Sequence, residues 1–588
     1  EIALPKPTGL AGNKQGKLYA ISERHVMTLG ENNTFRPVVT MGLKAPIGLA
    51  LDAAGNLYVS DWADQMCVKV FSPKGELLRE VGIKGGRPLE GKYDPNGMFL
   101  PWGMTVDGKN RLWVTEWDFT PKRVSVWDAA SGKLEREYIG PGYYGGTGNA
   151  VSLLNPNQAF TLNTIVDLDW DEGQWRVSGT LWRPTKANAF FGPKGSIIET
   201  ITHNGRELAV VLGKSGKCSI SELGPDGARP LMARGTLSQW AEWPLPEMIL
   251  KKMWDDPKMA KWAKKKYPWL FQNRYHYPFI MLKEMVTAAE RKGRPARTNF
   301  LWVDGNGDGL VDENELQLFS EDEAKGLNFN QNWRIGYDAD LTQYLYTTSE
   351  KDGKPVQNIW RWPVRKWNKA GAPVYDIADA KIYAQAPING QIQSIWANSK
   401  GEVVSNVDPL TCFAPDGNIR WTHPNRWPGV HGSHTAPKAK NGLLIGPLYV
   451  IGSADLGGEI GEVFCFNGNT GKAFIFTMDG LYVGSLFRDK RSAPDAMPNK
   501  QRRGMSLMRT TSGGEWFGGQ FFRNKLDGKT YVVNGGIGSD ISEVSGLDSL
   551  RRMPTRKVTF TPALLAEART LQGRQKRDSK KEHWVKLN

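Results

Sequence analysis

A stretch of twelve residues near the middle of the chain, from Asp304 to Glu315, has the residue types and spacing of a calcium-binding loop. Oxygen-bearing side chains occupy its first, third, fifth, ninth and twelfth positions. Gly309 stands at the sixth, where a loop wrapped around one ion must turn sharply. The alternative is a solvated turn rich in aspartate and glycine. The expected ligands are Asp304, Asn306, Asp308, Leu310 through its backbone carbonyl, Asp312 directly or through water, and Glu315.

Histidine is scarce in this sequence, at seven residues, yet His431 and His434 stand close together in a glycine-containing stretch that follows Arg426. Two histidines at this spacing can share a metal ion or abstract a proton, and the arginine can neutralise an acidic substrate. Tyr275 and His276, at the start of an expected helix, are further candidates for an acid or base. A loop bonded to its own backbone, and aromatic anchoring of the helix, are the non-catalytic alternatives.

The sequence contains 23 tryptophans, several of them in expected loops. Indole faces stack on the apolar faces of sugar rings, and guanidinium groups pair with carboxylates. Packing between structural repeats is the alternative role for the tryptophans. Four residues are expected to bind a substrate: Trp421, Trp427, Arg503 and Trp516. The sequence has no Walker loop, G-x-S-x-G elbow, H-E-x-x-H helix or strand-borne G-x-G-x-x-G, and no nucleic-acid-binding motif.

The elements around the calcium-like loop are predicted to be strands. Residues 299–303 form a short apolar, aromatic run that enters the loop, whereas an EF-hand would place a helix there, and the β-pattern restarts at 315–319. A strand on each side favours a brace over a calcium switch. Because the loop follows an expected helical insertion directly, we expect calcium to fix that insertion over the mouth of the fold.

The first 140 residues contain an internal repeat. The second copy begins 55 residues after the first. Each copy predicts a strand, an Asp/Gly turn, a second strand and a third strand that ends in a hairpin. Three to four short strands in a unit of this length are typical of a propeller blade. The matching positions are Pro46 and Pro101, Gly48 and Gly103, and Asp52 and Asp107.

These units resemble NHL-type β-propeller repeats over roughly residues 10–140, and the resemblance is much weaker beyond them. The stretch from Cys465 to Phe474 also resembles a turn of quinoprotein-like repeats. The resemblance implies an all-β fold: a single β-propeller of seven to eight four-stranded blades, with eight preferred, and a helical insertion between blades. The expected divisions are 1–236 (first half of the propeller), 237–298 (helical insertion, or cap), 299–555 (second half, beginning with the calcium loop) and 556–588 (basic tail).

Composition favours an anionic partner and a compartment outside the cytosol. The formal charge is +15, and no run of about 18 apolar residues could span a membrane. The start at Glu1, without methionine, suggests either a processed mature form or an expression boundary. The four cysteines lack C-x-x-C spacing, which excludes a zinc ribbon or a c-type haem site, and their pairing cannot be read. An oxygen-rich calcium loop suits a secreted or periplasmic protein.

Three functions agree with these features. The first is a secreted or periplasmic calcium-binding propeller that binds, and as an enzyme cleaves, an acidic polysaccharide, with a lyase-like site of histidine and arginine at the channel mouth. The second is a non-catalytic scaffold that contacts a protein partner through the Lys-rich insertion or the C-terminal tail. The third is a quinoprotein-like oxidoreductase, although the tryptophan docking motif of that family is not visible in each repeat.

Overall fold

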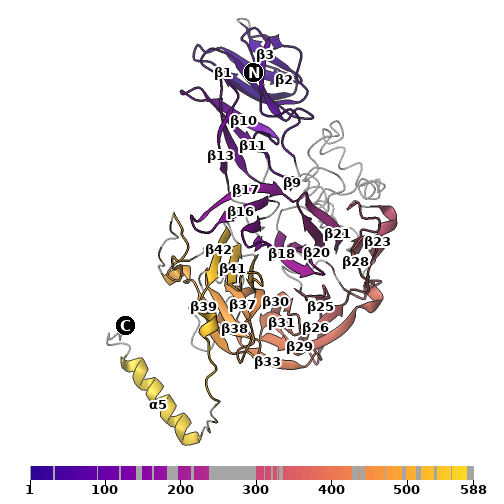
Figure 1. The fold of residues 1–588 in the computed structure, drawn as a ribbon, viewed down its shortest axis with the longest axis vertical. Helices are drawn as coiled ribbons and strands as arrows, with labels where there is room; N and C mark the ends of the chain where they lie inside the picture. The colour runs from indigo at the N-terminus through magenta and orange to yellow at the C-terminus, as the bar shows by residue number, and fades with distance from the viewer. Residues whose placement is uncertain are drawn as a thin grey trace.

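Antiparallel β-sheets make up nearly all of the computed structural model (Figure 1). It describes residues 2–578 except 31–32, 89–90, 118–120, 141–148, 162–163, 182–195, 214–217, 237–298, 310–311, 320–321, 328, 330–335, 427–434, 436–443, 446, 469, 493–494, 496–497, 499, 512–517, 536–538, 556, 558 and 560. Within these ranges, five sheets have four strands, and larger sheets have five, six and seven. The fold is therefore all-β and propeller-like.

The first three sheets have four strands each, in sequence order. Their strands are β1 (Pro7–Gly12), β2 (Leu18–Ser22), β3 (His25–Leu29) and β4 (Phe35–Val39); β5 (Pro46–Leu51), β6 (Leu57–Asp61), β7 (Cys67–Phe71) and β8 (Leu77–Val81); and β10 (Pro101–Val106), β11 (Arg111–Glu116), β12 (Arg123–Asp128) and β13 (Leu134–Ile139). Figure 1 shows them in a column above the remaining sheets.

The next two sheets have five and six strands. The five-stranded sheet joins β14 (Asn149–Val151), β15 (Gln158–Thr161), β16 (Thr164–Asp169) and β17 (Gln174–Thr180) to β9 (Gly91–Lys92), which connects it to the column. The six-stranded sheet contains β18 (Ser196–His203), β19 (Arg206–Gly213), β20 (Cys218–Gly224), β21 (Gly227–Thr236), β22 (Asn299–Val303) and β23 (Leu316–Phe319).

Four further sheets follow, two of them small. Their strands are β24 (Gly336–Tyr337), β25 (Gln343–Lys351), β26 (Lys354–Trp362) and β29 (Lys381–Pro387); the hairpin β27 (Lys366–Trp367) and β28 (Pro373–Val374); β30 (Asn389–Ala397), β31 (Val403–Asp408), β32 (Leu410–Phe413) and β33 (Ile419–His423); and the parallel pair β34 (Asn425–Arg426) and β35 (Leu444–Ile445).

The last sheet has seven strands because β36 and β40 pair in parallel and merge two units. It contains β36 (Pro447–Asp455), β37 (Glu462–Gly468), β38 (Ala473–Thr477), β39 (Tyr482–Leu486), β40 (Gly518–Arg523), β41 (Thr530–Gly535) and β42 (Ser539–Val544). This merger, together with the column formed by the first three sheets, means that the predicted count of eight blades in a single propeller is not confirmed.

Helices are few in the described ranges. Helix α5 (Pro562–Asp578) is capped at its start, where the Thr561 hydroxyl accepts a hydrogen bond from the Leu564 N–H at 3.2 Å, and it lies apart from the sheets (Figure 1). Short 3₁₀ turns are η3 (Glu313–Glu315), η4 (Ile377–Asp379), η5 (Lys490–Ser492) and η6 (Leu547–Ser549). The expected helices of 237–298 lie outside the described residues. No described helix is long and apolar enough to cross a membrane.

The core lies between neighbouring sheets rather than at one centre. On β6, Leu57 and Val59 pack with residues of the first sheet, while Tyr58 packs with residues of the third. Successive side chains of a strand point to opposite faces, so a strand with two covered faces buries side chains on both of them. All five residues of β6 are accordingly buried. Burial of both faces explains why the sequence shows continuous apolar runs in place of alternation.

One turn recurs at the first hairpin of five sheets. In each, a side-chain oxygen accepts hydrogen bonds from the backbone N–H groups two and four residues later, which is an Asx turn. The residue three positions later has a positive φ in every case: 79°, 83°, 57°, 61° and 76° in chain order. The oxygens belong to Asn13, Asp52, Asp107, Asp338 and Asn398.

Strand β40, from the last sheet, contacts β14 and β18, which belong to two earlier sheets. Gln520 of β40 accepts a hydrogen bond from the Val151 N–H at 3.2 Å and donates to the Thr200 hydroxyl at 3.1 Å. Thr200 in turn donates to the Val151 carbonyl at 3.0 Å. The three residues belong to three different sheets, and β14 contacts both β18 and β40. This buried polar contact closes the sheets from β14 onward around a common centre (Figure 1).

Tight stacking of successive sheets makes Gly75 irreplaceable. Its φ is +88°, and a Cβ there would lie 1.9 Å from the Val38 carbonyl oxygen of the preceding sheet. Gly16 has a similar φ of +79° but nothing within 4 Å. We expect Gly75→Ala to lower the free energy of unfolding by about 1–3 kcal/mol more than Gly16→Ala, because only Gly75 adds a clash to the backbone cost. Denaturant unfolding measures both, and equal losses would contradict the packing argument.

Candidate functional site

The 304–315 loop connects β22 to β23, which are neighbouring antiparallel strands. Both strands coincide with the predicted ones, so the loop is the turn of a hairpin and not the centre of a helix–loop–helix unit. The first strand of this sheet, β18, contacts β14 and β40, whereas β22 and β23 lie at the other end of its strand order. The loop is therefore at the outer rim, away from the common centre of the sheets.

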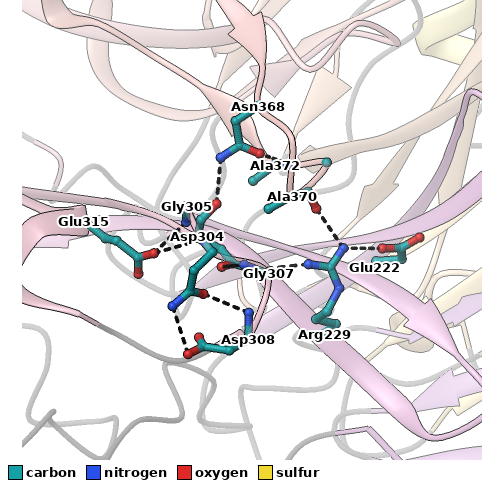
Figure 2. A network of polar contacts seen from close by, with 12 residues as sticks. Glu222, Arg229, Asp304, Gly305, Gly307, Asp308, Glu315, Asn368, Ala370 and Ala372 are labelled. Atoms are coloured by element: carbon teal, nitrogen blue, oxygen red, sulfur yellow. Dashed lines mark hydrogen bonds and ion pairs between the residues drawn. The ribbon is translucent and has the colours of Figure 1, made fainter.

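Within the loop, the oxygen-bearing side chains bind the loop's own backbone and one another (Figure 2). A carboxylate oxygen of Glu315 accepts hydrogen bonds from the N–H groups of Gly305 at 2.6 Å and Asn306 at 3.3 Å. The Asn306 amide donates to Asp308 at 3.0 Å and to Asp312 at 3.2 Å. The first and last positions of the loop are thus brought together, with the acidic side chains gathered around one amide.

Asp304 is the most constrained residue of the loop, since its side chain is completely buried. It accepts a hydrogen bond from the Gly307 N–H at 2.7 Å, and Arg229 of β21 lies 3.1 Å from its other oxygen. Burial raises the pKa of Asp304 above its ordinary value, and these two contacts offset only part of that rise. Arg229 also bonds Glu222 at 2.7 Å and the Ala370 carbonyl at 3.0 Å (Figure 2).

The loop is fastened to the neighbouring structural unit through the β27–β28 hairpin. The Asn368 amide donates to the Asp304 carbonyl at 2.7 Å, and Arg229 reaches Ala370 in the same turn. The insertion, residues 237–298, lies outside the described residues, so its predicted link to the loop stays a prediction. Thr236, the last residue of β21, precedes the insertion, and Asn299, the first residue of β22, follows it. These two residues are paired across the two strands. Asp304 follows the opposite end of β22, about 13 Å along the strand.

The loop suits calcium by the chemistry of its donors. Its side chains offer only oxygen, and Gly309 has a φ of +66° at the position where the loop must turn sharply. Leu310, the expected carbonyl ligand, lies outside the described residues. In the ranges that are described, no three His, Cys, Asp or Glu side chains are close enough together to hold a metal ion. Binding therefore requires the acidic side chains to move inward from their present hydrogen bonds.

Most of the other predicted site residues cannot be placed. Arg426 forms the short strand β34 with an exposed side chain. Trp421 donates from its indole N–H to the Met478 carbonyl at 2.9 Å and lies parallel to Phe464 at 6.1 Å, so it packs between two units. Arg503 lines a groove described below. Six predicted residues lie outside the described residues: Tyr275, His276, Trp427, His431, His434 and Trp516.

Asp540 is a partly buried carboxyl group that sequence reasoning missed. Burial raises its pKa to about 6, the range in which a carboxyl group can act as an acid or base. It is directly opposite Asn534, whose amide is buried and has no hydrogen-bond partner among the described residues. Nothing in the sequence distinguishes this aspartate from exposed ones. The four cysteines are also buried, and all are free thiols.

Arg229 is expected to stabilise the fold by compensating the buried Asp304 carboxylate. With calcium removed by EDTA, Arg229→Met should lower the free energy of unfolding by about 1–3 kcal/mol, because a buried charge loses its partner. Arg176→Met is the matched control, since Arg176 is 81% exposed and pairs with Asp167 at 3.1 Å. Loss of that exposed ion pair should lower the free energy of unfolding by no more than about 1 kcal/mol. Urea unfolding compares the two, and equal small losses would contradict a structural role for Arg229.

Asp540 is expected to make stability depend on pH. A folded-state pKa of about 6 against 3.8 for an unperturbed carboxyl group means that the folded protein binds the proton more tightly. The free energy of unfolding of the protein should therefore rise as the pH falls from about 6 to 4. Asp540→Asn should remove this slope and raise the free energy of unfolding at pH 7.5 by about 1–3 kcal/mol.

Glu543→Gln on the same strand is the control for Asp540→Asn, because Glu543 is an exposed partner of Lys529 at 3.0 Å. Denaturant unfolding between pH 4 and 8 measures both variants. An unchanged slope in Asp540→Asn, or an equal change in Glu543→Gln, would contradict the assignment.

Comparison with known proteins gives little guidance. No family model and no curated protein matches the chain. Among solved structures, it is similar to the gluconolactonase XC5397 of Xanthomonas campestris, with 14% identity, coverage of 38% of this chain and 75% of that chain, and a TM-score of 0.19. It is also similar to Kuenenia stuttgartiensis hydrazine synthase, with 12% identity, coverage of 70% and 96%, and a TM-score of 0.20. At these scores the fold description rests on the sheets themselves.

Proposed function

We propose that residues 304–315 bind calcium and that the ion braces a propeller-like protein that binds an acidic polysaccharide. The observation that carries the metal proposal is the gathering of Asp308, Asp312 and the Asn306 amide within one short loop, closed by Glu315. Like charges at this spacing repel one another, and a divalent cation relieves that repulsion. The proposed ligands are Asp304, Asn306, Asp308, Asp312, Glu315 and the carbonyl of Leu310.

The effect of calcium in this proposal is mechanical. Asp304 is held to the β27–β28 hairpin through its carbonyl and to β21 through its carboxylate. An ion bound to the same residue would stabilise the turn that carries both contacts. Two adjacent units would then be fixed relative to each other, and no chemical step would pass through the metal. The position of the loop at the rim agrees with a brace and not with a catalytic centre.

The acidic polysaccharide is supported by charge and side-chain chemistry. The net charge of +15 attracts polyanions, and Arg503 stands in a groove that also contains two tryptophans. A calcium loop of this kind suits a secreted or periplasmic location, where calcium is abundant. Cleavage of the polysaccharide by His431 or His434, assisted by Arg426, stays a prediction from the sequence. The binding part of the proposal is supported by described residues, because Arg503 and the two tryptophans line one groove.

Calcium is expected to raise the thermal stability of the wild-type protein and EDTA to lower it. A ligand at 100 times its Kd stabilises the folded state by about 2.7 kcal/mol. Asp308→Ala should abolish this response without unfolding the protein, because Asp308 is exposed. Asp322→Ala is the control, since Asp322 is also exposed but follows the loop. Differential scanning calorimetry with calcium and with EDTA, together with calcium titration calorimetry, measures these effects.

An unchanged melting temperature on adding EDTA, with no heat of calcium binding, would contradict the metal proposal. A calcium response retained in Asp308→Ala would contradict the assigned ligands. The polysaccharide proposal is tested separately, by titrating the wild-type protein with a polyuronate and with a neutral polysaccharide of the same length.

A further inference from the structure

A groove of about 700 Å³ lies between three segments that are distant in sequence. One wall is the β16–β17 hairpin, the second consists of residues 486–487, 498 and 501–508, and the third is the edge strand β42 with Lys529. The volume is within the usual range of ligand-binding clefts, ~300–1,000 Å³. The groove lies apart from the 304–315 loop, and none of the residues that line it belongs to that loop.

The first two walls are held together by a backbone contact that only glycine permits. Gly173, in the β16–β17 turn, has a φ of +63°, and a Cβ there would lie 1.9 Å from the Gln501 carbonyl oxygen. The two residues are both part of the groove's lining. The adjacent Arg503 lies 3.4 Å from Asp171 in the same turn. The groove is thus a defined junction and not an accidental gap.

The cationic groups of the groove are available to a ligand. Arg502 is exposed and has no side-chain partner among the described residues. Arg503 is 46% exposed, and its partner Asp171 is 82% exposed, so this ion pair is weak and readily exchanged. A carboxylate that enters the groove can accept two parallel hydrogen bonds from either guanidinium group. Lys529 adds a third cation, paired with Glu543 at 3.0 Å.

Two tryptophans give the groove apolar surface. The Trp175 ring is 54% exposed. Trp170 is fixed by a hydrogen bond from its indole N–H to the Pro156 carbonyl at 3.0 Å, and the Arg503 guanidinium lies 6.0 Å from its ring centre. Indoles offer large, rigid faces that pack against the C–H faces of sugar rings. The Arg503 guanidinium beside Trp170 would bind a carboxylate of a sugar chain in the groove.

We propose that this groove is the site that binds the acidic polysaccharide, through uronate carboxylates on Arg502 and Arg503 and sugar rings on Trp170 and Trp175. The inference rests on the proposed function and moves its site from the central mouth to the rim. Asp169 and Glu543 also line the groove, and both can accept hydrogen bonds from sugar hydroxyls. These two carboxylates repel any polyanion, so the choice of a sugar chain rests on the hydroxyl groups that they can bind and on the exposed indole surface.

The test is calorimetric titration with an oligogalacturonate of defined length, in calcium and at low ionic strength. We expect the double variant Arg502→Gln/Arg503→Gln to lower the affinity at least tenfold, because each hydrogen bond to a charged group is worth roughly a factor of ten or more. Arg503→Lys keeps the charge but loses the planar fork and should lower affinity less. Arg509→Gln is the control, since Arg509 is 78% exposed, pairs with Asp495 at 2.8 Å and does not line the groove.

The outcomes separate this inference from the proposed function. If the double variant keeps the wild-type affinity, the groove is not the binding site, but the proposal that the protein binds an acidic polysaccharide still stands. No binding by the wild-type protein overturns the polysaccharide proposal and the inference with it. Equal affinity for a single-stranded oligodeoxynucleotide overturns the assignment to sugars. Melting temperatures of all variants within a degree or so of the wild type are expected, because both arginines are exposed.

Discussion

The close stacking of one sheet on the next is the constraint on which the rest of this structure depends. A strand with both faces covered buries side chains on both of them, and the turns that join such strands pass within contact distance of the neighbouring backbone. Gly75 against Val38 and Gly417 against Tyr383 show the same solution in different parts of the chain, since a Cβ would clash with a carbonyl oxygen in each. Functional side chains are therefore confined to turns and to the junctions between units.

This constraint decides what the sequence could predict. The Asx turns at Asp52 and Asp107 were recognisable as repeats because glycine or asparagine supplies the positive φ. At Asp338 the same turn uses Leu341 with a φ of 61°, so the pattern Asp-x-x-Gly is lost although the geometry remains. Leu341 is fully buried, and its packing compensates the backbone strain. A repeat maintained by tertiary packing leaves no local pattern to find.

The 304–315 loop shows the same division between local and long-range information. Both flanking strands follow from local spacing and were predicted correctly, whereas calcium binding by the candidate ligands stays a prediction. Its partners Arg229 and Asn368 were not predictable, because they come from different units and meet the loop only when the sheets stack.

The groove follows from this arrangement in the same way. Arg503 was selected from the sequence for its chemistry, but Trp170 lies more than three hundred residues earlier, and the two meet only where the 170–173 turn packs against residues 501–503. Both proposed sites therefore lie where separate units meet, and neither lies at the common centre. At a junction, side chains from two independent turns can be combined without interrupting any strand ladder. A stacked-sheet protein that lacks space inside its core can place binding chemistry there, provided that something holds the adjoining units in register.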